Sequence, residues 1–386
     1  MVERKQINIM YTYNEDWIAG VYYVCNIIKA LKFLPDENKP VLRILYTRSS
    51  SLEHIEATEY PYIEYLCVPD KLIIIKRAIN KFIRIFFGNY IFFKFKLLEQ
   101  LPNLFLADLR YNLLTVKQPV VWIPDFQEKY VPQFFSKMAV YNRHVYYITV
   151  IKNELDVVFS SNNAKNDFKK FYPQHTNKKY VLRFASIIDI GKLFKCNETI
   201  LRNKYSLNKP YFVVSNQFWA HKNHIVVLEA LKIVKEKNPE ILVVFTGKES
   251  DHRNPKYTDS LKTFVIENNL SDNVRFLGFV DRTEQLALLR HSIAVIQPSL
   301  FEGWSTVVED CKTIGKHIVL SNLPVHIEQI NEDVTFFDPL DENRLAEILL
   351  SDIKGNNYTE TELTKKLEQR IITFANDFLS IFETNN

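Results

Sequence analysis

A regular alternation of apolar segments with helix-like segments most constrains the fold of this chain, and it begins near residue 211. Six short segments rich in Val, Ile, Leu and Phe are expected to be strands: 211–215, 240–246, 274–277, 293–296, 317–320 and 334–337. The segments after them have helical character: 223–237, 257–269, 283–290, 305–314, 324–330 and 341–352. Strands that alternate with helices predict a parallel sheet covered on both faces, which binds ligands at the carboxyl ends of its strands.

The N-terminal part of the chain has a similar but looser alternation. Its expected strands are 6–11, 41–46, 63–68, 119–123, 155–160 and 180–184, and its expected helices are 21–34, 132–152 and 164–171. The polar stretch 186–210 reads as a linker. We therefore expect an α/β protein of two doubly wound, Rossmann-like domains, residues 1–190 and 205–355, with a last helix over 359–382 as a candidate to pack back on the first domain.

The totals exclude several classes of protein. With 49 basic and 45 acidic residues, the charge is too balanced for nucleic acid to be the main partner. The four cysteines, Cys25, Cys67, Cys196 and Cys311, have no CxxC spacing, which disfavours a zinc site or a disulfide framework. No apolar run reaches the ~18–20 residues of a membrane span, and no N-terminal signal is visible. We expect a cytoplasmic protein, with the inner face of the plasma membrane as an alternative location.

Two carboxylates stand around the start of the helix expected at 305–314. A helix that begins at Ser305 or Thr306 directs free backbone N–H groups toward the preceding strand, and such groups bind anions. Glu302, before this point, and Glu309, one turn inside the helix, can each hold hydroxyl groups. A phosphate flanked by hydroxyls describes a sugar nucleotide. The alternative is a capping box, in which Glu309 reaches back to a helix start at Thr306.

The polar and aromatic segment that follows the strand 211–215 is a second candidate. Lys222 lies at an expected helix start, where a cation is mildly unfavourable, and a bound diphosphate would explain it. The alternative is a solvated lysine beside a capping Asn223. His221 and His224 lack a third ligand nearby, so we expect no metal. Gly247, after the next strand, would let the backbone approach a ligand, although neither dinucleotide nor P-loop glycine motifs are present.

These motifs resemble the GT-B fold, retaining glycosyltransferases of group 1, a family that includes glycogen-synthase-like enzymes and the sugar transferases of bacterial lipopolysaccharide and capsule. The resemblance is carried by Asn216–His224, Phe276–Phe279 and Pro298–Glu309, and more weakly by Trp17–Tyr23 and Trp122–Gln127. It implies two Rossmann-like domains that face a central cleft. The N-terminal domain would bind the acceptor, and the C-terminal domain would bind the nucleotide sugar.

The resemblance also implies roles for single residues. Glu309 would bind the ribose, Glu302 the hydroxyls of the donor sugar, and Lys222 the diphosphate. On the acceptor side the candidates are Asp125 and Gln127, although an Asp after Pro124 is also a common turn residue. The implied donor-site residues are Gly20, Asn216, Gln217, Gly247, Gly303, Trp304, Ser305, Thr306 and Glu309.

The chain departs from the family pattern at four places. Six residues separate Glu302 from Glu309, where the family has seven between its two acids. Gln217 replaces an arginine, so that a positive charge on the diphosphate is missing or comes from elsewhere. Ala19 replaces a glycine, and Glu128 stands where related chains often have histidine.

The resemblance therefore implies a retaining transfer from a nucleotide-diphosphate sugar to a glycan or lipid-linked acceptor, in the synthesis of a surface polysaccharide. The leaving phosphate would take the acceptor proton, so no cofactor or metal is implied. The alternatives are a catalytically weak sugar-nucleotide-binding subunit of a membrane complex, or an epimerase or phosphorylase of the same fold.

Residues 71–98 hold seven basic residues and no acidic one, and they predict a basic amphipathic helix. Such a helix is typical of a membrane-surface element, with a core helix as the alternative.

Overall fold

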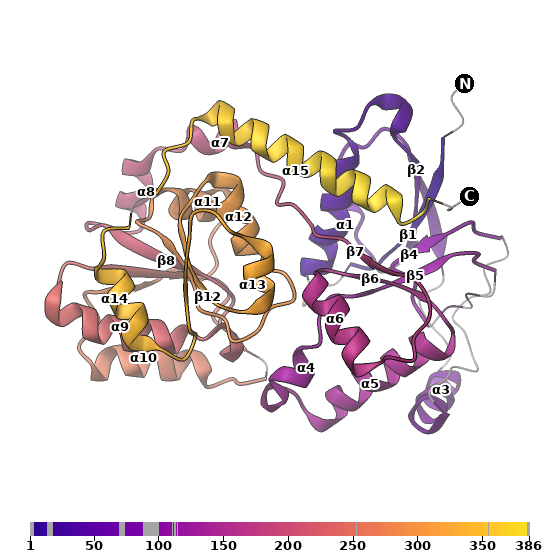
Figure 1. Cartoon of the computed structure of the whole chain (residues 1–386), viewed down its shortest axis with the longest axis horizontal. Helices are drawn as coiled ribbons and strands as arrows, with labels where there is room; N and C mark the ends of the chain where they lie inside the picture. Colours follow the sequence, from indigo (N-terminus) through magenta and orange to yellow (C-terminus); the bar gives the residue numbers. More distant parts are fainter. Residues whose placement is uncertain are drawn as a thin grey trace. The chain divides into compact units, whose positions relative to one another are not determined.

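The computed structural model describes residues 4–13, 18–68, 74–87, 100–109, 111, 113, 115–251, 253–353 and 355–383. The chain forms two compact units (Figure 1). The first comprises the chain up to residue 126, residues 136–187 and the chain from residue 368. The second comprises residues 127–135 and 188–367. Each unit is described by itself.

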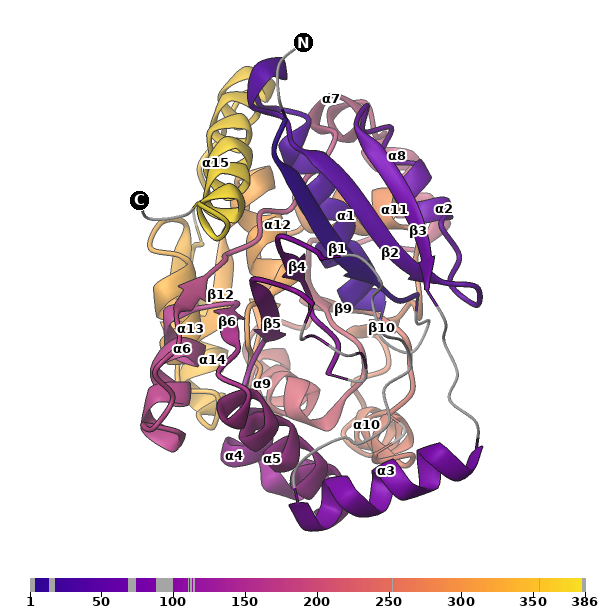
Figure 2. The same cartoon turned by 90° about the vertical axis from the view of Figure 1, so that its right-hand side faces the viewer.

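The first unit is built on a parallel sheet of seven strands in the order β3-β2-β1-β4-β5-β6-β7. The strands are β1 (Gln6–Tyr11), β2 (Val41–Thr47), β3 (Ile63–Val68), β4 (Leu104–Phe105), β5 (Pro119–Ile123), β6 (Asp156–Phe159) and β7 (Lys179–Val181). Its helices are α1 (Ile18–Leu31), η2 (Asp36–Asn38), α2 (Glu53–Glu56), α3 (Ile74–Phe87), α5 (Lys137–Lys152) and α6 (Asn162–Phe171). The sheet has the crossover order of a doubly wound fold because β1 lies between β2 and β4 (Figure 2).

The C-terminal end of α15 (Glu360–Ser380) also belongs to the first unit. The rings of Phe378 and Phe382 pack against Phe105 of β4, with centroids 5.1 and 6.2 Å away. Gln118 donates a hydrogen bond of 2.9 Å to the carbonyl of Ile381. The last turns of the chain therefore complete a core that is otherwise built from its first half.

The second unit is built on a parallel sheet of six strands in the order β10-β9-β8-β11-β12-β13. The strands are β8 (Tyr211–Ser215), β9 (Leu242–Thr246), β10 (Val274–Phe276), β11 (Val295–Gln297), β12 (Ile318–Ser321) and β13 (Val334–Phe337). The helices are α4 (Gln127–Tyr130), η3 (Pro132–Phe134), α7 (Ile190–Phe194), α8 (Glu198–Lys204), η4 (Ala220–Lys222), α9 (His224–Lys237), α10 (Tyr257–Glu267), α11 (Arg282–His291), α12 (Thr306–Ile314), α13 (Pro324–Gln329) and α14 (Glu342–Leu350), followed by the start of α15.

Successive residues of β8 face opposite sides of this sheet, as the side-chain period of a strand requires. Phe212 and Val214 join an apolar cluster formed with α9, α10 and α14. Tyr211 and Val213 join a second cluster formed with α8, α11 and α12. Both faces are therefore buried, which explains the nearly continuous apolar strands and confirms the two doubly wound α/β domains expected from the sequence.

The expectation that residues 186–210 form a linker is wrong. This stretch contains α7 and α8, and their Leu193 and Leu201 are buried in the core of the second unit. Helices of five and seven residues are too short to give a clear hydrophobic period. The two-residue strand β4 was also not expected.

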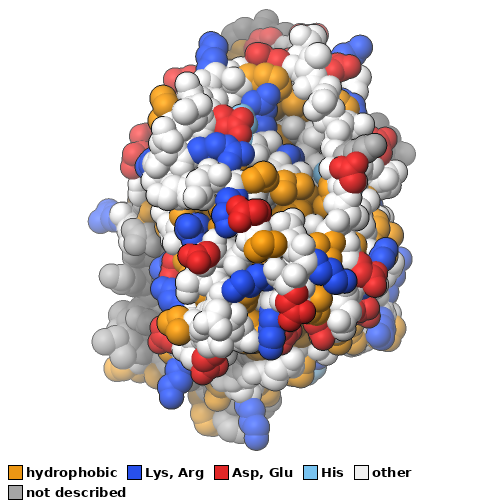
Figure 3. Space-filling view, turned by 90° about the vertical axis from the view of Figure 1, so that its left-hand side faces the viewer, with side chains coloured by type: hydrophobic (Ala, Val, Ile, Leu, Met, Phe, Trp, Pro, Cys, Tyr) orange, Lys and Arg blue, Asp and Glu red, His pale blue; other side chains and the backbone are white. Residues whose placement is uncertain are grey.

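The basic segment 71–98 contains α3, while residues 71–73 and 88–98 lie outside the described part. The side chains of Ile75, Ile79 and Phe82 are exposed on this helix. Among the described helices, none has the length and apolar character needed to span a membrane. On the face shown in Figure 3, basic and acidic side chains are interspersed, in line with the balanced composition.

Candidate functional site

The site is formed by two loops at the carboxyl end of the second sheet. Lys222 ends η4, the next element after β8, and Glu302 lies in the loop between β11 and α12. Because β8 and β11 are parallel neighbours, the loops that follow them meet at one edge of the sheet. The backbone N–H of Leu300 donates to the carbonyl of His221 over 2.8 Å, which joins the two loops.

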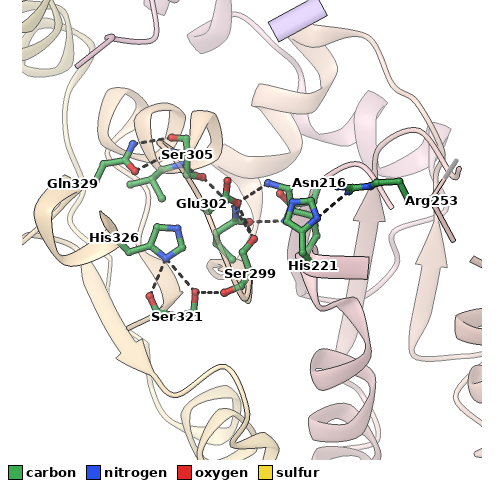
Figure 4. Close-up of polar contacts among 12 residues, drawn as sticks. Asn216, His221, Arg253, Ser299, Glu302, Ser305, Ser321, His326 and Gln329 are labelled. Atoms are coloured by element: carbon green, nitrogen blue, oxygen red, sulfur yellow. Dashed lines mark hydrogen bonds and ion pairs between the residues drawn. The ribbon is translucent and has the colours of Figure 1, made fainter. Parts of the chain in front are cut away.

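An ion pair between Lys222 and Glu302 lies at the centre of the site, and Figure 4 shows Glu302 close to Ser299. The Nζ atom of Lys222 is 2.6 Å from Oε1 of Glu302, and the two side chains are only 15% and 9% exposed. Gln297 Nε2 and Ser299 Oγ each donate to the same Oε1 over 2.8 Å. Asn216 in turn donates to Oε1 of Gln297 over 2.5 Å and so orients it.

The second carboxylate oxygen of Glu302 is arranged differently. No described residue donates a hydrogen bond to Oε2, and this atom is not sealed from solvent. Burial alone would raise the pKa of Glu302, but the charge of Lys222 and the hydrogen bonds outweigh it and lower the pKa. Glu302 is therefore an ionised acceptor, with one oxygen held by the protein and one open.

The start of α12 lies beside this pair. Ser305 is the N-cap, and its Oγ accepts from the N–H of Val308 over 3.5 Å. The side chain of Gln329 in α13 makes two hydrogen bonds with the backbone of Ser305. Its Oε1 accepts from the N–H of Ser305, and its Nε2 donates to the carbonyl of Ser305. The N–H groups of Thr306 and Val307 have no acceptor among the described residues, and such groups at a helix start favour an anion.

The capping-box alternative for Glu309 is wrong. The N-cap is Ser305 rather than Thr306, so the third helical residue is Val308. Oε1 of Glu309 instead accepts from Lys312 over 2.8 Å and from Gln329 over 3.0 Å. The side chain of Glu309 is thus buried between α12 and α13.

Asp310 is a further candidate that the sequence analysis did not name. It is fully buried, and both its oxygens accept from Arg282 at the start of α11, over 2.6 and 2.7 Å. Arg282 is 46% exposed, so the pair reaches the surface. Seven residues separate Glu302 from Asp310, which is the spacing between the two acids of the family pattern. The sequence could therefore have indicated Asp310 in place of Glu309 as the second acid.

Gly247 has a clear structural requirement. Its φ is +138°, and a Cβ atom there would lie 2.0 Å from the carbonyl oxygen of Asn216. Its N–H donates to Gly278 over 2.8 Å. The glycine therefore lets the loops after β8, β9 and β10 approach one another, and its contact with a ligand stays a prediction. Gln217, beside Asn216, is exposed.

The other candidates are described in the unit to which each of them belongs. Gly20 was expected in a loop, but α1 begins at Ile18, so Gly20 lies in its first turn. In the first unit, Asp125 pairs with Arg143 over 3.3 Å. Gln127 is buried at the start of α4 in the second unit. Gly303 and Trp304, between Glu302 and the N-cap, are half-buried. Within the described residues, no three His, Cys, Asp or Glu side chains cluster as metal ligands would.

Comparison with known proteins agrees with this geometry. The profile of the family described as "Glycosyl transferases group 1" matches residues 197–372. The O-antigen chain mannosyltransferase RfbU of Salmonella typhimurium is 23% identical over 232 residues, which are 60% of this chain and 60% of that protein. The matched part of the chain thus spans less than two thirds of this curated relative.

Solved structures share the fold over nearly the whole chain. A glycosyltransferase from Rickettsia africae has a TM-score of 0.64 at 14% identity, with 98% of both chains covered. Anabaena Alr3699/HepE in complex with UDP and glucose has a TM-score of 0.62 at 15% identity, with 98% of this chain and 97% of that chain covered. The resemblance and the GT-B fold class predicted from the sequence are confirmed.

Proposed function

We propose that this chain, whose residues 197–372 match the glycosyl transferases group 1 family, transfers a sugar from a nucleotide-diphosphate sugar to a glycan or lipid-linked acceptor. We further propose that the transfer retains the anomeric configuration. The observation that carries the proposal is the Lys222–Glu302 pair beside the start of α12, with Oε2 of Glu302 open. One cation, one helix start and one open carboxylate suit a diphosphate joined to a sugar.

In this proposal Lys222 serves two partners. Its ammonium has three protons, and one is used by Glu302 in the free protein. The others neutralise the donor diphosphate together with the N–H groups of Thr306 and Val307. Oε2 of Glu302 accepts a hydrogen bond from a hydroxyl of the donor sugar. Each group is already in place, so little reorganisation is needed when charge develops.

We assign the ribose to Asp310 ahead of Glu309. The spacing from Glu302 supports this assignment, and Arg282, which pairs with Asp310, is 46% exposed. Ribose hydroxyls would displace Arg282 from the carboxylate. Glu309, the candidate from the sequence, is the alternative. Lys312 and Gln329 bond to its Oε1, as Arg282 bonds to both oxygens of Asp310.

The reaction needs no dedicated nucleophile. As the bond between sugar and phosphate breaks, negative charge moves to the diphosphate, where Lys222 and the helix start stabilise it. The leaving phosphate oxygen takes the proton of the acceptor hydroxyl, which then bonds to the anomeric carbon on the same face. Asp125, held by Arg143, is the candidate that orients the acceptor.

Two of the similar proteins support the choice of substrates. Anabaena Alr3699/HepE was solved in complex with UDP-glucose, which suits a nucleotide-diphosphate sugar as the donor here. The Salmonella relative is an O-antigen chain mannosyltransferase, which suits a surface polysaccharide as the product.

A panel of nucleotide sugars tests the proposal. The full-length protein should slowly release nucleotide from one of UDP-, GDP- or ADP-sugars, and Glu302→Gln should abolish the release. Glu236→Gln, on the exposed side of α9, is the matched control. Proton NMR of the sugar linkage after addition of a crude lipid acceptor fraction reports retention or inversion. Binding without turnover in that mixture would favour the non-catalytic subunit, and no binding of any donor would refute the proposal.

We also propose that α3 contacts an anionic membrane at the cytoplasmic face. Its exposed Ile75, Ile79 and Phe82 lie within a segment that carries seven basic residues and no acidic one. Flotation with vesicles that contain anionic lipid should recover the protein at low salt. Phe82→Glu should weaken the recovery, and an absence of binding by the unchanged protein would exclude the contact.

A further inference from the structure

His221, the residue before Lys222, has an environment that the proposed function does not yet use. Its side chain is 3% exposed and lies among aromatic rings, with the centroids of Trp219 and Phe134 at 5.5 and 6.2 Å. In Figure 4 the imidazole stands between Arg253 on one side and the Glu302 cluster on the other. The hydrogen-bond partners of the two ring nitrogens, Nδ1 and Nε2, are therefore considered one at a time.

Arg253 accounts for the first nitrogen. Its Nη2 is 3.2 Å from Nδ1 of His221. A guanidinium group can only donate hydrogen bonds, so Nδ1 must be the acceptor. Because a neutral imidazole carries one proton, that proton is then on Nε2.

Arg253 is itself fixed firmly enough to impose this tautomer. Asp251 accepts from its backbone N–H over 2.9 Å and from its Nε over 3.4 Å. Its guanidinium also lies over the rings of Trp219 and Phe135, 4.9 and 5.5 Å from their centroids. The arginine is therefore held from both ends of its side chain.

The second nitrogen of His221 has no protein partner. No described residue accepts a hydrogen bond from Nε2, and the atom is not sealed from solvent. Burial, followed by the charges of Lys222 and Arg253 and by His224, lowers the pKa of His221 to about 2. The ring is thus neutral around pH 7, and it presents one N–H donor at Nε2.

We propose that Nε2 of His221 donates a hydrogen bond to a phosphate oxygen of the donor diphosphate, and that Arg253 is the positioning residue that holds the required tautomer. The contact supplies what the family obtains from an arginine at the position of the exposed Gln217. A neutral donor has an advantage here, because a second cation would repel Lys222 in a poorly solvated place. This inference rests on the proposed function, since it names a further contact to the same ligand.

Two substitutions of His221 separate the ring nitrogens. His221→Asn keeps an acceptor for Arg253 near the position of Nδ1 but loses the distal donor. His221→Gln can place an amide N–H near the position of Nε2. Titration calorimetry of the full-length protein with UDP, GDP and ADP, and with the corresponding monophosphates, should show about ten-fold or greater loss of diphosphate affinity in His221→Asn. His221→Gln should lose about three-fold or less.

The outcomes distinguish this inference from the proposed function. If the unchanged protein binds none of the three diphosphates, both are overturned. If it binds one of them and His221→Asn binds it equally well, only the role of His221 is overturned. Thermal unfolding of each variant shows whether a loss of affinity comes from misfolding.

Nitrogen-15 NMR tests the tautomer without any ligand. The unchanged protein should show the Nε2–H form of His221, and Arg253→Met, which keeps an apolar side chain against the rings, should show a mixture of tautomers. An Nδ1–H form in the unchanged protein would overturn the inference.

Discussion

Removal of the Lys222 ammonium gives the sharpest test of the site, because it leaves the buried carboxylate of Glu302 without its cation. At a separation of 2.6 Å and an effective dielectric constant of about 20, the pair attracts by about 6 kcal/mol, part of which offsets the desolvation of both groups. Two neutral donors, Gln297 and Ser299, stay on Oε1. We therefore expect Lys222→Met to lower the free energy of unfolding by about 3 kcal/mol at pH 7.5.

The loss of unfolding free energy in Lys222→Met, called the deficit below, should depend on pH in a defined direction. In the unchanged protein the pKa of Glu302 lies below its unfolded value, so its contribution is present above the unfolded pKa and is lost as pH falls through the folded pKa. Without Lys222, we expect burial to dominate and to raise the folded pKa of Glu302 above the unfolded value. The ionised carboxylate then destabilises the fold at neutral pH, and protonation relieves this. The deficit of Lys222→Met should therefore shrink between pH 7.5 and pH 5.

Urea unfolding at both pH values measures the deficit, with Lys237→Met, at the exposed end of α9, as the control. In the double variant Lys222→Met/Glu302→Gln no charge is left unpaired, so most of the lost stability should return. Additive effects of the two substitutions, together with a deficit that does not change with pH, would refute the ion-pair reasoning.

Three further predictions follow from the site. Gly247→Ala should lower the free energy of unfolding by about 3 kcal/mol or more, because its Cβ would lie 2.0 Å from the Asn216 carbonyl oxygen at a φ of +138°; Gly355→Ala, whose Cβ meets nothing within 4 Å, should be near neutral in the same urea assay. Asp310→Asn should weaken nucleoside diphosphate binding in calorimetry by about ten-fold, and Glu309→Gln by less than about three-fold, while the reverse order would move the ribose to Glu309. Donor hydrolysis should continue unchanged after treatment with EDTA, and a loss that Mg²⁺ or Mn²⁺ restores would contradict the metal-free proposal.

Long, strongly patterned elements could be predicted from the sequence. The strands β1, β3, β5, β8 and β13 have the expected bounds, because apolar runs between turn residues mark a buried parallel strand. The placement of Lys222 and Glu302 after neighbouring strands was also predictable, since chain order and the doubly wound topology bring these strand ends together.

The details that sequence could not supply depend on helix phase and on tertiary contacts. Glu309 and Asp310 are adjacent, yet they face α13 and α11 respectively, because consecutive helical residues differ in direction by about 100°. The directions of both side chains follow from the position of the N-cap, which is Ser305. The bond between Arg253 and His221 spans 32 positions and leaves no local pattern.

The packing of Phe378 and Phe382 on Phe105 has a consequence for synthesis. A ribosome finishes the whole second unit before residues 368–383 emerge, so the nascent first unit exposes an apolar surface around β4 until those residues have been made. Chaperone occupancy should therefore persist on the N-terminal half of the nascent polypeptide, and a stop codon after residue 367 should yield an aggregating product despite an intact downstream Rossmann-like unit.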